Sequence, residues 1–161
     1  MSTYGEPLTY SQWQNAWSDP NISEIDCLAR VIYAEDTVNV AGEYAVAKEI
    51  WNRKMSGNPK RFARDKVNLT WKNIIFKSAE YNVATGSEEH CKHAMKPTKN
   101  RYWDNCVARA SELVAGAVPS SLLGGQKYHR ASSSFSSAGI TGIDTSTIKA
   151  IGGNLYKKEI G

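Results

Sequence analysis

The segment that most limits how this chain can fold is residues 25–35, an apolar run with helical spacing that ends on a carboxylate. Leu28, Ile32 and Glu35 are four and three residues apart, so they project from one side of a helix. Ser23 lies just before the run, and Asp26 follows Ser23 by three residues, which is a pattern typical of a helix start. The sequence therefore predicts a core-facing helix with Glu35 at its end. Partial burial there would favour the protonated form of Glu35, which suits a general acid.

Helical and strand patterns follow one another in a definite order. Tyr10, Trp13 and Trp17, at spacings of three and four, predict a short helix packed on the main body. Further helices are predicted over residues 25–36, 42–55, 71–76 and 101–116, with Thr70 as an N-cap and a loop over the polar residues 77–100. Strands are predicted at residues 126–129 and within 145–158, and a loop at 132–137.

This order of elements predicts the fold class and the domain organisation. Helices that come first, followed by a small C-terminal β element, indicate an α+β fold that is mostly helical. A chain of 161 residues is long enough for one domain with a real core. We expect an N-terminal helical lead over residues 1–22 and a single domain over residues 23–161.

The second long helix is predicted to bury one side and expose the other. Its buried side is marked by Tyr44, Ala47, Ile50, Trp51 and Met55. Glu49 and Arg53 are four residues apart and are predicted to form an ion pair on the outside. Asp36 and Glu43 are predicted to be surface residues.

Composition narrows the class of protein. With 41% hydrophobic and 22% charged residues, a soluble globular protein is expected. The net charge of +4 comes from scattered cations without a long basic block, which favours an ordinary solvated surface. We expect no nucleic-acid partner and no membrane insertion, because no apolar stretch is long enough to cross a bilayer. Three cysteines, widely spaced, do not describe a disulfide framework and fit a reducing compartment.

Metal and nucleophile patterns are weak. His90, Cys91 and His93 are potential zinc ligands, but they lack a matched second pair, so no metal and no other cofactor is expected. The serine run at 132–137 lacks a nucleophile elbow, and nothing in the sequence orients Cys91 with His93.

Several segments, taken in order, resemble the spore-cortex-lytic (SleB-like) cell wall hydrolase family, which includes phage endolysin domains. The opening motif corresponds to Ala29-Arg30 with Glu35, then Gly42, Val46-Ala47 and Asn52-Arg53. Later segments correspond to Ile74-Ile75-Phe76, Trp103-Asp104-Asn105-Cys106, Gly124-Gly125-Gln126-Lys127-Tyr128-His129 and Ile151-Gly152-Gly153-Asn154-Leu155-Tyr156. The resemblance covers about residues 25–157.

The resemblance implies a lysozyme-like fold and cleavage of peptidoglycan between N-acetylmuramic acid and N-acetylglucosamine, by a lytic transglycosylase or a muramidase. It implies that Glu35 is the catalytic acid. Glu80, Tyr81, Tyr128 and His129 are the residues expected to bind the substrate. One carboxylate suffices if the 6-hydroxyl of the sugar attacks, because the same group then acts as acid and afterwards as base.

Three departures from the family pattern bear on the site. The loop after Glu35 is one residue shorter and reads Asp36-Thr37-Val38-Asn39, Glu80-Tyr81-Asn82 replaces the usual Gln-Phe-Ser, and Asn154 replaces a histidine. If Glu80 faces Glu35, a second carboxylate could activate water and yield a hydrolytic product.

Two alternatives remain at this point. One is a relative that binds peptidoglycan without cleaving it. The other is a zinc-dependent amidase that uses His90, Cys91, His93 and His129.

Residues 1–7 have no secretory signal pattern, so we expect a protein made in the cytoplasm that reaches the cell wall by phage delivery or at lysis. We expect it to be a monomer.

Overall fold

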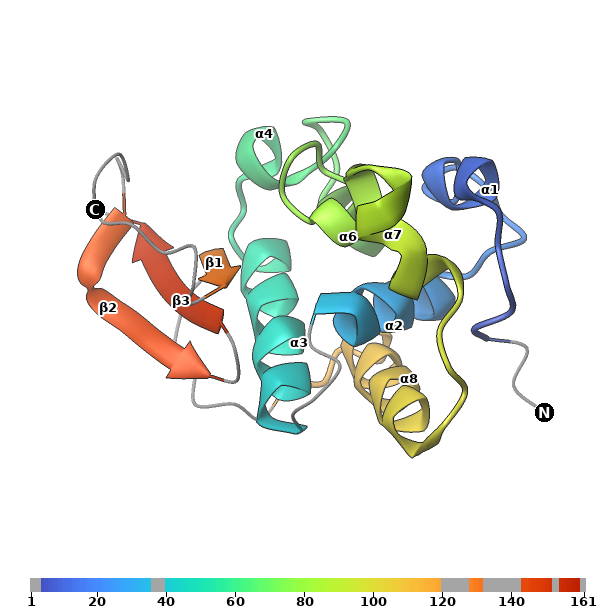
Figure 1. Ribbon diagram of the computed structural model, residues 1–161. Coiled ribbons are helices and arrows are strands. Elements are labelled where there is room, and N and C mark those ends of the chain that lie inside the picture. The colour runs from blue at the N-terminus through green and yellow to red at the C-terminus, as the bar shows by residue number, and fades with distance from the viewer. Residues whose placement is uncertain (1–3, 36–39, 120–127, 132–142, 152–153, 160–161) are drawn as a thin grey trace.

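The computed structural model describes residues 4–35, 40–119, 128–131, 143–151 and 154–159. The helices are α1 (Tyr10–Gln14), α2 (Glu24–Glu35), α3 (Val40–Lys54), α4 (Pro59–Phe62), α5 (Trp71–Ile75), α6 (Asn82–Thr85), α7 (Glu88–Met95) and α8 (Arg101–Val114). The strands are β1 (Tyr128–Ala131), β2 (Ile143–Ile151) and β3 (Asn154–Glu159), in the antiparallel order β1-β3-β2. The sheet lies beside α3, on the side away from α2 (Figure 1). The predicted, mostly helical character is confirmed over these residues.

Helix α2 is the centre of the helical body. It is contacted by α3, α5, α6, α7 and α8, and every residue from Asp26 to Tyr33 is buried. A helix that is buried on all sides packs against neighbours on all sides, and the mostly apolar sequence of α2 allows this packing. Ser23 Oγ accepts a hydrogen bond from the Asp26 N–H at 3.1 Å, which confirms the predicted helix start. Leu28 and Ile32 are fully buried, as their spacing predicted.

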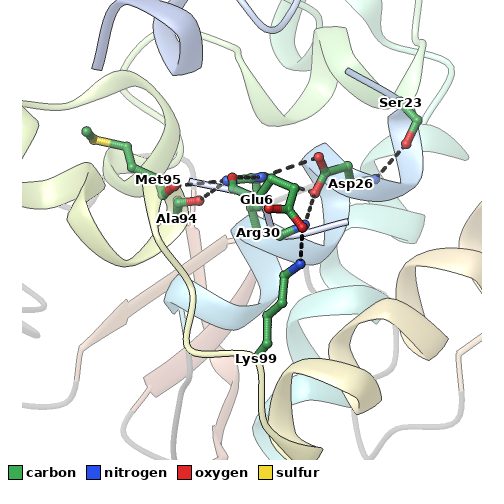
Figure 2. Close-up of polar contacts among 8 residues, drawn as sticks. Glu6, Ser23, Asp26, Arg30, Ala94, Met95 and Lys99 are labelled. Atoms are coloured by element: carbon green, nitrogen blue, oxygen red, sulfur yellow. Dashed lines mark hydrogen bonds and ion pairs between the residues drawn. The ribbon is translucent and has the colours of Figure 1, made fainter. Parts of the chain in front are cut away.

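A guanidinium lies inside this core. Arg30 is fully buried, and its Nε donates to Asp26 Oδ1 at 2.9 Å, one turn earlier. Its Nη1 donates to the carbonyls of Ala94 and Met95 at 2.9 and 3.1 Å, and its Nη2 donates to the Glu6 carbonyl (Figure 2). Carbonyls in the last turn of a helix have no partner within the helix. Arg30 therefore caps the end of α7 and joins it to α2 and to the lead.

The lead is fastened to α6 and α7 as well. The Leu8 N–H donates to the Met95 carbonyl at 2.9 Å. Trp13 Nε1 donates to the Val83 carbonyl, and Gln14 Nε2 to the Ala84 carbonyl, both at 2.9 Å. Trp13 is fully buried within the same core as α2, so the predicted packing of the lead on the main body is confirmed. The helix itself is shorter than predicted, because α1 ends at Gln14.

The prediction of a loop over residues 77–100 was wrong, since α6 and α7 lie there. Ser87 caps α7 by accepting from the His90 N–H, and acidic residues occupy its first turn. Cys91 and Ala94, three residues apart, are its buried face. A helix this short with so few large apolar residues has little periodicity to detect, and its stability comes from docking on the lead and α2.

The remaining predicted helices are present with small shifts at their ends, and Thr70 caps α5 as expected by accepting from the Asn73 N–H. The predictions for Asp36, for residues 126–127 and for the loop at 132–137 concern residues outside the described ranges. None of the helices in the described part of the chain combines the length and the apolar character that crossing a bilayer requires.

Replacing Arg30 with Met should destabilise the protein strongly. The change keeps an apolar stem but removes the cation from buried Asp26 and the donors from three carbonyls. We expect the free energy of unfolding to fall by about 3–5 kcal/mol, measured by chemical denaturation.

The matched control is Lys92→Met, which breaks the exposed ion pair between Lys92 and Glu89 on α7. Its expected cost is about 1 kcal/mol or less. Equal losses in the two variants would contradict the role given to Arg30.

Candidate functional site

Glu35 is the last residue of α2 and is only partly buried, although residues 26–33 before it are enclosed. The sequence predicted both the helix end and the apolar stripe that leads to it. The backbone of this carboxylate is thus fixed by the most buried helix of the protein, while its side chain has access to solvent. Such a position gives an acid a defined place and still lets a substrate reach it.

Helix α3 carries a buried polar face that the sequence analysis placed wrongly. Glu43 and Glu49 are fully buried and Arg53 is 2% exposed, so neither the surface position of Glu43 nor the outward Glu49–Arg53 pair is correct. The reason is that α3 is enclosed on several sides, by α2, α5, α8 and β2. The rule that side chains four residues apart form surface ion pairs applies to the solvent-exposed side of a helix, and this face of α3 is enclosed.

Tyr81 joins this buried polar face. Its hydroxyl donates to Glu49 Oε1 at 2.7 Å, and the Arg53 guanidinium lies over its ring, 4.8 Å from the centroid. Burial raises the pKa of Tyr81 well above its usual value of 10.0. Arg53 opposes the rise, and the negative charges of Glu49 and Glu35 add to it.

The expectation that Tyr81 lines a substrate cleft does not fit its complete burial. Tyr81 lies at the N-cap position of α6, where the chain turns inward, and its hydroxyl is already used by Glu49. Any effect of Tyr81 on a substrate would therefore be indirect, through Glu49, Arg53 or Glu35.

Glu80, the next residue back, remains partly exposed. Its Oε2 lies 3.3 Å from Arg53 Nη1, with 25% of the Glu80 side chain accessible. The structure thus directs the Glu80 carboxylate toward α3 and Arg53. Of the residues that the sequence predicted for the site, Glu80 and Tyr81 are linked through Arg53, and the charge of Glu35 contributes to the raised pKa of Tyr81.

Tyr128 and His129 are placed by their backbone only. Both belong to β1, which pairs with β3 so that Tyr128 lies opposite Lys157 and His129 opposite Tyr156. Their side chains lie outside the described part of the structure. Their role in substrate binding stays a prediction.

The proposed zinc ligands do not converge. Cys91 is buried on the inner face of α7, whereas His90 and His93 are exposed. The Cys91 sulfur lies 3.6 Å from the carbonyls of Asn82 and Gly86. Within the described ranges, no three His, Cys, Asp or Glu side chains are grouped as metal ligands would be.

The cysteines are not suited to nucleophilic chemistry. None of the three forms a disulfide, and all three are buried. Burial raises the pKa of Cys27 to about 12, and burial also raises the pKa of Cys91. A buried thiol with a raised pKa remains protonated and unreactive at neutral pH.

A signal for the buried face of α3 was present in the sequence. Glu43, Val46, Ile50 and Arg53 follow the spacing of three, four and three that marks one side of a helix. Two charged residues on an otherwise apolar stripe indicate a buried polar network. Buried charges are commonly paired, and such pairs serve either the structure or the function of a protein.

Comparisons with protein-family models, with curated proteins and with solved structures found no match to this chain.

Replacing Tyr81 with Phe should remove the hydrogen bond that its hydroxyl donates to the buried Glu49 carboxylate. We expect a loss of about 1–3 kcal/mol in the free energy of unfolding at neutral pH. Tyr44→Phe is the control, because Tyr44 is partly exposed, and it should stay within about 0.5 kcal/mol of wild type.

The pH dependence gives a second measurement for the same variant. Because the pKa of Tyr81 is raised in the folded state, the phenol ionises first in the unfolded chain, and stability is lost as pH rises above 10.0. The wild type should therefore lose stability more steeply than Tyr81→Phe in this range. Parallel curves would contradict the buried position of the phenol.

Proposed function

We propose that this protein cleaves the glycan strand of peptidoglycan between N-acetylmuramic acid and N-acetylglucosamine, as a lytic transglycosylase or muramidase with a lysozyme-like α+β fold. Glu35 acts as the general acid and base. The observation that carries the proposal is the position of Glu35, which ends the central buried helix and is itself partly exposed.

The burial of the residues behind the family resemblance supports this assignment. Ala29, Arg30, Val46, Ala47 and Arg53 are all buried. Arg30 fixes α2 in the core, and Arg53 links α3 to Tyr81 and Glu80. These residues therefore form the support on which the position of Glu35 depends, which is what an enzyme of this type requires around its acid.

The chemistry follows from one carboxyl group. A glycosidic oxygen is a poor leaving group until it is protonated, and Glu35 would supply that proton as the bond to the anomeric carbon breaks. In the transglycosylase reaction, the ionised Glu35 then takes the proton of the muramic acid 6-hydroxyl as this oxygen attacks the same carbon. In the muramidase reaction, water takes the place of the 6-hydroxyl.

Glu80 decides between these two outcomes in the proposal. Its pairing with Arg53 holds the carboxylate against α3, an arrangement that favours Glu35 as the single catalytic carboxylate. Single-carboxylate cleavage fits the lytic transglycosylase reaction. The hydrolytic reaction would need Glu80 to leave Arg53 and activate water.

Replacing Glu35 with Gln should abolish most cleavage while leaving the fold intact. Loss of the acid should lower the rate of muropeptide release from purified peptidoglycan by roughly 10²–10⁴-fold. Glu24→Gln is the matched control, because Glu24 is a partly buried carboxylate at the opposite end of the same helix. It should retain near-normal activity.

The result also separates the alternatives. Near-normal cleavage by Glu35→Gln would refute the assignment of the acid. A wild-type protein that sediments with peptidoglycan but releases no muropeptide would instead be a binding relative. Loss of wild-type activity on adding a chelator would favour the zinc amidase.

Mass analysis of the released muropeptides tests the role of Glu80. We expect anhydro ends from the wild type and the same ends from Glu80→Gln. Reducing ends from the wild type, with a large loss of their formation in Glu80→Gln, would establish the two-carboxylate hydrolysis in place of the proposed reaction.

A further inference from the structure

Residues 54–77 concentrate the positive charge of the chain. They contain seven of its 20 Lys and Arg residues but only one of its 16 Asp and Glu residues, so the segment carries +6 while the whole chain carries +4. The rest of the chain is therefore net negative. A charge asymmetry of this kind indicates a surface that attracts anionic partners.

Part of the segment lies at an edge of the helical body, whereas α5 packs against α2 and α3 and buries Trp71, Ile74 and Ile75. The segment comprises the end of α3, then α4, a loop and α5, and α4 with its following loop lies at the upper edge in Figure 1. Lys54 Nζ donates to the Leu69 carbonyl at 2.9 Å, which fastens the end of α3 to this loop. The Arg64 N–H donates to the Asn73 carbonyl at 2.8 Å, which fastens the loop to α5.

The one acidic residue of the segment is used by its own loop. The Asp65 carboxylate accepts the N–H groups of Val67 and Asn68, both at 2.8 Å, and the Asn68 side chain at 3.1 Å. These hydrogen bonds hold the pKa of Asp65 below its ordinary value. Lys66, next in the chain, has a φ of 61°. Asp65 thus fixes a tight turn from which Lys66 and Val67 are exposed to solvent.

Exposed apolar side chains accompany the cations. Met55, which follows α3, is 56% exposed, and Val67 is 70% exposed. Trp17 is 37% exposed, with its ring 4.4 Å from the Arg64 guanidinium. Aliphatic groups among exposed cations are typical of proteins that bind at a lipid interface. Binding of single-stranded nucleic acid would instead call for several exposed rings on which bases stack, whereas Arg64 already lies over the Trp17 ring and the aromatic side chains of the segment, Phe62, Trp71 and Phe76, are buried.

We propose that Lys60, Arg61, Arg64 and Lys66, together with Met55 and Val67, form a basic face that binds the surface of anionic phospholipid membranes. The cations contact the headgroup phosphates, and the two apolar side chains enter the headgroup region. The contact is peripheral and involves no spanning segment. It does not rest on glycan cleavage, since Glu35 and its buried neighbours are not part of it.

Vesicle sedimentation tests this proposal without an activity assay. The full chain should bind vesicles of phosphatidylcholine mixed with phosphatidylglycerol, and should not bind vesicles of phosphatidylcholine alone. Binding should weaken as salt is raised, because salt screens exposed charges. Equal binding to both kinds of vesicle, or binding to neither, would overturn the proposal.

A triple variant, K60Q/R61Q/K66Q, tests the position of the charges. Since each removed cation near an anionic surface costs about fivefold in affinity, the expected loss is roughly 100-fold. The matched control K92Q/K96Q/R101Q removes the same charge from exposed positions on and around α7 and α8. It should bind nearly as well as wild type, and an equal loss in both variants would reduce the effect to net charge and overturn the proposal.

A double variant, M55S/V67S, tests the apolar part. It should weaken binding to the mixed vesicles, including at raised salt, while the fold measured by circular dichroism and thermal unfolding stays unchanged. Unchanged vesicle binding by this variant, combined with tighter binding of single-stranded DNA by the wild type, would assign the face to nucleic acid and contradict the lipid proposal.

Discussion

The buried guanidinium of Arg30 is the interaction on which the helical body depends. It joins three parts of the chain that are far apart in sequence, since its partners are Asp26 on its own helix, Glu6 in the lead, and Ala94 and Met95 at the end of α7. Burying a charge is costly unless it is paired and its donors are satisfied. Here one carboxylate and three carbonyls meet that requirement, so the cation stabilises the one arrangement that supplies all of them. Apolar packing alone would be less selective about how α7 and the lead dock on α2.

A second buried polar group connects this scaffold to the candidate site. Arg53 on α3 lies over the Tyr81 ring and pairs with Glu80, while the Tyr81 hydroxyl is held by Glu49. Glu35, at the end of the helix that Arg30 anchors, affects the same phenol electrostatically. The two arginines are both part of the resemblance to cell wall hydrolases, and both are enclosed rather than offered to a substrate. From these buried positions the two arginines maintain the geometry around the acid, and only Glu35 performs the chemistry in the proposed reaction.

The features that the sequence could predict are those that depend on interactions between neighbouring residues. Helices α2 and α5 were predictable because their apolar periodicity and their caps, Ser23 and Thr70, depend on neighbouring residues. Helix α7 was missed because its buried face consists of the small residues Cys91 and Ala94 and its support comes from the distant lead. The burial of Glu43, Glu49 and Tyr81 was missed for a related reason. Whether a polar residue is enclosed depends on which elements cover it, and α3 is covered by helices from both earlier and later parts of the chain and by β2. Of the candidate site, Glu35 was therefore predictable, whereas the network behind it was indicated only by the spacing of Glu43 and Arg53 along the apolar stripe of α3.

The attachment of the lead to α6 and α7 has a consequence for how the protein is made. Trp13, Gln14 and Leu8 bind carbonyls of Val83, Ala84 and Met95, which leave the ribosome some seventy or more residues later. Throughout that interval of synthesis, the indole of Trp13 lacks the Val83 carbonyl, and the guanidinium of Arg30 lacks the carbonyls of Ala94 and Met95. The apolar residues of α2 in the nascent chain therefore stay incompletely covered until α7 and then α8 emerge, and during this period a chaperone could bind them.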